Sequence, residues 1–164
     1  MAKIREDQPL MPSVLDRLID YDPGNKRDAP SSRAQVLREL KLSVRRDLEN
    51  LLNTRRRCLE WPPTFTELEV ALVNYGIPDF TGTVLSRQRQ REEFRRTVEK
   101  VIRVFEPRFK QVQVEMLDNS EPTDHTLRFR INALLHAEPA PEPVVFDSAL
   151  EPTRGTYEVK GGGR

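Results

Sequence analysis

What the sequence has little of sets the first limits on this chain. It contains one cysteine, Cys58, which excludes an internal disulfide and fits a reducing compartment. No apolar run approaches the roughly 18 residues that a membrane span needs. Residues 1–16 also lack the apolar core of a signal peptide. We therefore expect a soluble, cytoplasmic protein.

A strong net charge of either sign is absent as well. The chain has 27 basic and 26 acidic side chains, although charged residues make up 32% of it. Such a balance argues against a general binder of polyanions. Arginine runs at 45–46, 55–57 and 87–96 could form a patch for nucleic acid, but acidic residues such as Asp47, Glu92 and Glu93 are interleaved with them. Solvated helix faces or an acidic protein partner explain these arginines better, so we predict no nucleic-acid partner.

Motifs for metal, cofactor or phosphate binding are also missing. His125 and His136 stand far from Cys58 in the sequence, and the three do not have the spacing of metal ligands. There is no glycine-rich phosphate loop. Cys58 has no base assigned to it, which favours a small packed residue over a nucleophile. We predict no metal, no cofactor and no small-molecule substrate.

The best-defined pattern is an amphipathic helix that runs into a strand. Apolar side chains of period 3.6 form one stripe of the helix, at Phe94, Val98, Val101, Ile102 and Phe105. Pro107 lacks an N–H, so the helix should end just before it. Beyond it Val112, Val114 and Met116 alternate with polar residues, which predicts a half-buried strand.

Glu106, Pro107 and Arg108 lie at this joint and form a rigid corner that displays two opposite charges. We interpret them as a docking site for a protein partner. Glycoside hydrolysis would need a second carboxyl group nearby, and no spacing in the sequence provides one. Arg108 would also stabilise the ionised form of Glu106, which cannot act as a general acid. We therefore predict no catalytic residue, and keep a peptidoglycan-cleaving glycosidase as the alternative.

The N-terminal arm carries a second candidate interface. Leu15, Leu18 and Ile19 share one face of a short helix that opens at Pro12. A helix of this length is marginal alone, so it must dock on its own domain or on a partner. Turn-forming residues follow it. We divide the chain into an arm (1–31), one α+β domain (32–160) and a flexible tail (161–164).

The remaining elements complete an α+β reading. Ser32 and Gln35 open a long helix to about Asn53, and Thr64 and Glu67 open a short one to Asn74, with Gly76 as its left-handed cap. Later stretches alternate like strands, at 127–135, 144–146 and 155–160. Helices first and an antiparallel sheet last indicate the α+β class. The edge of that sheet either pairs with an incoming strand or is merely blunted by the prolines near 140.

Four stretches together resemble one family. They are 12–20 (PSVLDRLID), 43–55 (SVRRDLENLLNTR), 73–79 (VNYGIPD) and 105–108 (FEPR). Their order is similar to that of the TssE family, the baseplate wedge subunits of bacterial type VI secretion, which are related to the wedge proteins of contractile phage tails and carry a historical lysozyme label. The match covers nearly the whole chain.

The resemblance implies a structural protein rather than an enzyme. It implies a wedge with TssF and TssG, association with TssK, and a platform on which the TssB–TssC sheath starts. Glu106, Pro107 and Arg108 match the family's Glu-Pro-Arg motif, which we expect to contact the sheath. The implied location is the cytoplasmic baseplate near the inner membrane, docked at the membrane complex without insertion. The fold is also similar to the strand-exchange domain of sheath subunits.

Overall fold

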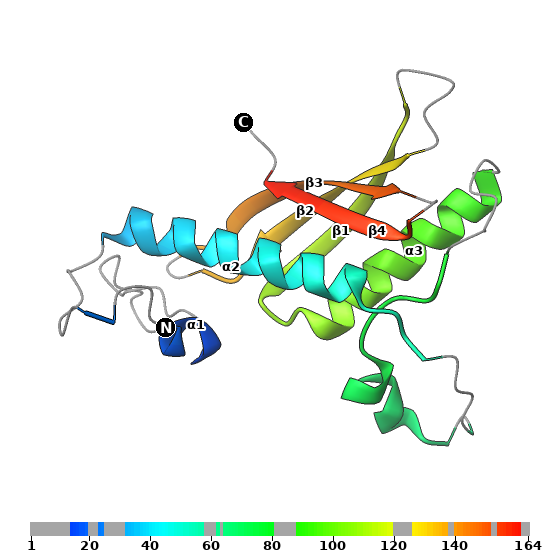
Figure 1. The fold of residues 1–164 in the computed structure, drawn as a ribbon, viewed down its shortest axis with the longest axis horizontal. Helices are drawn as coiled ribbons and strands as arrows, with labels where there is room; N and C mark the ends of the chain where they lie inside the picture. Colours follow the sequence, from blue (N-terminus) through cyan, green and yellow to red (C-terminus); the bar gives the residue numbers. More distant parts are fainter. Residues whose placement is uncertain are drawn as a thin grey trace.

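The chain was analysed as a computed structural model, which describes residues 14–19, 23–24, 32–57, 62, 64–80, 88–119, 126–137, 140–151 and 154–161. Figure 1 shows the helical elements α1 (Val14–Leu18), α2 (Arg33–Asn53) and α3 (Gln88–Phe105), and the strands β1 (Phe109–Leu117), β2 (Leu127–Leu135), β3 (Glu142–Glu151) and β4 (Thr156–Gly161). Two 3-10 turns, η1 (Thr66–Glu69) and η2 (Leu72–Asn74), lie between α2 and α3. The predicted α+β class is confirmed. Among the described helices, none is long and apolar enough to cross a membrane.

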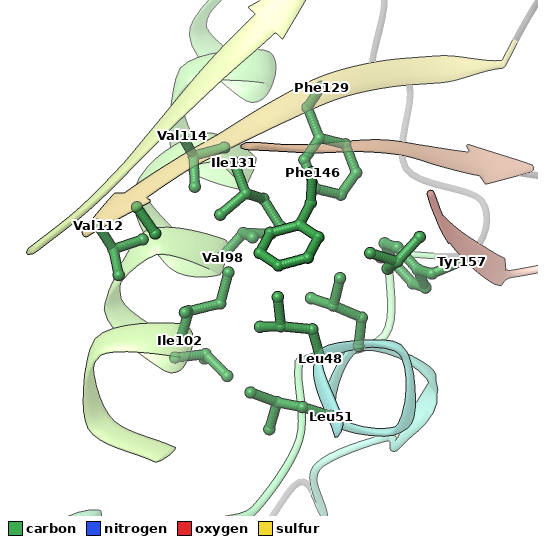
Figure 2. Close-up of a cluster of buried hydrophobic side chains, with 14 of the residues drawn as sticks. Leu48, Leu51, Val98, Ile102, Val112, Val114, Phe129, Ile131, Phe146 and Tyr157 are labelled. Atoms are coloured by element: carbon green, nitrogen blue, oxygen red, sulfur yellow. The ribbon is translucent and has the colours of Figure 1, made fainter. Parts of the chain in front are cut away.

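The sheet is an antiparallel meander covered by two helices. Its strand order is β1-β2-β3-β4, with α3 packed along β1 and α2 along β4 (Figure 1). Alternate strand residues point toward the helices, as the sequence predicts for β1 and β2. Figure 2 shows where the two layers meet, with Leu48 and Ile102 from the helices facing Ile131 and Phe146 from the sheet.

Both long helices follow the predicted periodicity. The hydroxyl of Ser32 caps α2 by accepting a hydrogen bond from the Gln35 N–H, and α2 ends at Asn53. The predicted stripe of α3 is buried except for Phe105, which is half-buried and packs edge-on against Tyr75. A 3.6-residue period was therefore enough to place the two elements that cover the sheet.

The segment between these helices differs from the prediction. Instead of one short helix capped by Thr64, it forms η1 and η2, and Phe65 precedes η1 without a side-chain cap. Gly76 does adopt a left-handed conformation, with φ of 107°. A Cβ there would lie 2.3 Å from the carbonyl oxygen of Thr54, so the close backbone approach requires glycine.

The third strand is longer than the sequence indicates. β3 runs from Glu142 to Glu151, beyond both ends of the strand predicted at 144–146, and it includes Pro143. Gly161, assigned to the tail, is the last residue of β4. A proline is tolerated in a strand where its missing N–H would not have joined the ladder, and β4 pairs only with residues 146–151 of β3, which leaves Pro143 beyond its end.

Candidate functional site

The Glu106–Arg108 corner is folded inward. Glu106 is 5% exposed, and its two carboxylate oxygens accept hydrogen bonds from Arg108: Oε1 from Nε at 2.6 Å and Oε2 from Nη2 at 2.5 Å. The expectation that both charges face solvent is therefore wrong for Glu106. Pro107 is the exposed member of the three. A buried carboxylate requires such a partner, because unpaired burial of its charge is costly.

Arg108 also ties the corner to α2. Its Nη2 donates to Asp47 Oδ2 at 2.7 Å, and its Nη1 donates to the hydroxyl oxygen of Ser43 at 3.2 Å. Burial opposes the charged form of Arg108, but hydrogen bonds and charge from Glu106 and then Asp47 outweigh it and raise the pKa of the guanidinium. The corner thus fastens the helix-to-strand joint to the middle of α2.

The arm reaches the same corner. Asp16 on α1 accepts a hydrogen bond from the Ser43 hydroxyl at 2.7 Å and another from Arg46 Nη2 at 2.9 Å. The hydrogen bond to Asp16 is the largest cause of a raised pKa at Arg46. Ser43 therefore donates to the arm and accepts from Arg108. Through this hydroxyl the 12–20 motif and the 105–108 motif, which are far apart in the sequence, are connected in space.

The apolar residues predicted for the arm remain largely uncovered. Leu15 is 59% and Leu18 is 75% exposed, whereas Ile19 is half-buried. The arm thus docks through Asp16 rather than through the face that the periodicity suggests. Sequence reasoning missed Asp16 because its partners lie far along the chain. The sequence feature that could have indicated Asp16 is its place within the 12–20 motif.

Side chains of α3 cover the outer edge of β1. The Val114 N–H donates to Glu99 Oε2 at 3.3 Å, and Arg103 Nη2 donates to the Val112 carbonyl at 3.4 Å. Arg95 bridges Glu92 and Glu99 on the same helix, at 2.8 Å from an oxygen of each. An edge whose main-chain groups are already bonded is a poor template for an added strand.

Side chains of α2 cover β4 in the same way. The Tyr157 N–H donates to Asn53 Oδ1 at 2.9 Å, and Asn53 Nδ2 donates to the Tyr157 carbonyl at 2.8 Å. Arg45 Nη1 donates to the Val159 carbonyl at 3.1 Å. Main-chain groups of β4 that point away from β3 are thus hydrogen-bonded to α2 at Tyr157 and again at Val159.

One stretch of β3 remains open among the described residues. β4 pairs with residues 146–151 of β3, and no described residue pairs with 142–145 on that side. Alternate residues of a strand point their main-chain groups to opposite sides. The N–H and C=O of Tyr157 point away from β3, so those of its partner Leu150 point toward β2. By alternation along β3, the N–H and C=O of Val145 and the C=O of Pro143 face the open side. The missing N–H of Pro143 consequently interrupts no ladder bond.

A groove of about 500 Å³ lies between this stretch and the first half of α2. Its exposed apolar side chains are Leu42 and Val145, at 54% and 39%. Lys41 pairs with Glu142 at 2.9 Å across it, and basic side chains predominate along its walls, at Arg38, Lys41, Arg45 and Arg130. An extended, partly acidic segment fits this combination of shape, charge and free main-chain groups.

Two observations on the described residues bear on metal binding and catalysis. No group of three or more His, Cys, Asp or Glu residues that could hold a metal occurs among these described residues. Both oxygens of Glu106 accept hydrogen bonds from Arg108. Cys58 and His125 lie outside the described residues.

Fold and site together describe a small α+β protein whose charged groups connect the arm, α2 and the start of β1. Residues 38–140 match the family model described as Baseplate wedge protein gp25. The chain belongs to this family and has a structural role in a baseplate, in association with other baseplate components. A comparison with curated proteins gave no match.

Proposed function

We propose that this wedge protein serves a bacterial type VI secretion system, where it joins TssF and TssG, associates with TssK, and nucleates the TssB–TssC sheath. All four motifs resemble the TssE family, and the N-terminal arm favours the secretion system over the shorter phage-tail proteins. The protein would act without catalysis, in the cytoplasm at the baseplate near the inner membrane.

The observation that carries the sheath role is the open stretch of β3. Both outer edges of the sheet are bonded to helix side chains, whereas Val145 presents a donor and an acceptor to the groove. A sheath strand that entered there would gain main-chain hydrogen bonds and cover Leu42 and Val145. Basic side chains along the groove would favour acidic residues on that strand.

The corner and the arm supply the other contacts of this proposal. Exposed Pro107, held in place by the pair of Glu106 and Arg108, would touch the first sheath ring. Leu15 and Leu18 are exposed on α1 and would cover apolar surface of the wedge proteins, together with the half-buried Ile19 that follows them.

A proline substitution tests the open edge. Val145→Pro removes the outward N–H while leaving the ladder to β2 intact, and Val145→Thr is the matched control that keeps the N–H. In cells that carry the secretion system, sheath foci should disappear with the proline variant and persist with threonine. Thermal unfolding and copurification with TssF and TssG should stay near normal for both. Normal foci with Val145→Pro would overturn the sheath role of this edge.

A further inference from the structure

The contact between the arm and α2 has the form of an occupied binding site. Asp16 places one carboxylate oxygen on the Ser43 hydroxyl at 2.7 Å and the other on Arg46 Nη2 at 2.9 Å. The side chain of Asp16 is only 16% exposed, although it belongs to a helix of five residues. A hydroxyl and a guanidinium that each engage one oxygen form a charge-assisted cradle for a carboxylate.

The cradle is built on the core rather than on the arm. Ser43 and Arg46 lie one turn apart on α2, and Ser43 is 7% exposed. Arg108 donates to the Ser43 oxygen at 3.2 Å, which leaves the hydroxyl proton to point toward an acceptor. The positions of these groups are therefore fixed by α2 and by the corner, whatever the arm does.

The arm itself is held with little apolar burial. Val14, Leu15 and Leu18 are 73%, 59% and 75% exposed, so hydrophobic contact contributes little to its docking. A five-residue helix also has little stability of its own. An arm fixed largely by polar contacts at one end exchanges readily with a competitor of the same chemistry.

We propose that Ser43 and Arg46 form a carboxylate-binding site that Asp16 fills in cis, and that an aspartate or glutamate side chain of a partner fills when the arm moves away. Asp47 and Glu106 lie beside the site, with Asp47 Oδ1 3.3 Å from Arg46 Nε. These neighbouring negative charges favour a singly charged carboxylate over a phosphate group. Binding of the arm and of the partner at this site exclude each other. The proposal does not depend on sheath nucleation, and it can be tested on this chain alone.

The test uses the full-length chain and the arm's own sequence as the probe. An acetylated and amidated peptide of residues 14–19 is titrated into wild type and into Asp16→Asn, with the amide resonances of residues 43–47 followed by NMR. We expect binding to Asp16→Asn at least about tenfold tighter than to wild type, because the tethered arm competes at an effective concentration near millimolar. The same peptide with asparagine in place of its aspartate should not bind.

Two further variants make the result decisive. Asp118→Asn removes an exposed carboxylate that pairs with Arg91 and should behave like wild type. Ser43→Ala in the Asp16→Asn background should abolish binding while the spectrum remains that of a folded core. Equal binding of the acidic and asparagine peptides, equal binding to wild type and Asp16→Asn, or no binding to any variant would each overturn the proposal.

Discussion

Asn53 and Tyr157 exchange two hydrogen bonds, in which the amide side chain of α2 takes the place that a neighbouring strand would occupy. Tyr157 is 7% exposed, so its main-chain groups have limited access to water. The pair anchors the last strand to the first long helix. It also fills an edge position that could otherwise pair with a second chain.

Replacing Asn53 by alanine should therefore destabilise the protein by about 1–2 kcal/mol, since two partly buried main-chain groups lose their partners. For a chain of this size the melting temperature should fall by roughly 2–8 °C. Asn50→Ala, an exposed position on the same helix, is the matched control and should change little. An unchanged melting temperature for Asn53→Ala would mean that water replaces the amide at no cost.

The corner should behave as a brace rather than as a free surface. Arg108→Met leaves Glu106 and Asp47 without their partner, which should cost about 3 kcal/mol and lower the melting temperature by roughly 6–12 °C. Adding Glu106→Leu to that variant should recover much of the loss, because no buried carboxylate then remains at position 106. Arg96→Met, whose side chain is 73% exposed and among the described residues pairs only with Glu92 on its own helix, serves as the control.

Charge reversal at positions 106 and 108 tests whether Asp47 contributes to the stability of the corner. The double change of Glu106→Arg with Arg108→Glu should not restore stability, because the carboxylate introduced at position 108 would face Asp47. Thermal unfolding of the single and double variants measures this. A melting temperature fully restored in the double variant would show that Asp47 does not contribute to the stability of the corner.

Gly76 should resist replacement by alanine. A Cβ would meet the Thr54 carbonyl oxygen at 2.3 Å, and the φ of 107° is unfavourable for any other residue. We expect a loss of more than about 1 kcal/mol, with the parallel bridge between Arg55 and Ile77 weakened first. Hydrogen exchange at the Ile77 and Arg56 amides should rise before that of the sheet. Uniform exchange across the whole chain would contradict a local effect.

Alkaline pH should destabilise the fold through Tyr157. Burial raises the pKa of its hydroxyl above the ordinary value of 10.0, so the unfolded chain loses that proton more easily than the folded one. Stability from this group is complete below about pH 10 and is lost as the pH rises further. Denaturant titrations between pH 9 and 12 should show a steeper decline for wild type than for Tyr157→Phe. Parallel declines would assign the alkaline loss to other groups.

The purified protein should not hydrolyse peptidoglycan at any pH. Glu106 has both oxygens bonded to Arg108, and the neighbouring carboxylate of Asp47 accepts from the same Arg108 Nη2, so the guanidinium lies between the two acids. A turbidity or muropeptide assay of wild type beside Glu106→Gln is sufficient. Cleavage that vanished in the variant would contradict the structural role.

Local periodicity was sufficient to place α2, α3, β1 and β2, because each pattern repeats over several turns or strand residues. The 3-10 turns were missed because capping-box spacing at Thr64 cannot report that the backbone near Gly76 packs against Thr54. The start of β3 was missed for a similar reason: Pro143 is acceptable only because its missing N–H faces an open edge, which is a property of the whole sheet.

The functional residues show the same division. The Glu-Pro-Arg motif was recognisable, but its inward orientation depends on Asp47 and Ser43, which no local spacing connects to it. Asp16 was missed because the apolar spacing of Leu15, Leu18 and Ile19 predicted docking through those residues instead. Contacts between distant segments decide which member of a motif is exposed, and a single sequence contains no direct record of them.

The open stretch of β3 has a geometric consequence for anything built upon it. It lies in line with β4, beyond Gly161, with α2 along one side. Within the described part of the sheet, this stretch accepts an added strand from one end of one edge, so every copy of this chain offers it in the same direction and at the same angle. If sheath strands enter here as proposed, a ring of such chains would give the growing sheath a single polarity and a fixed rotational phase from its first layer.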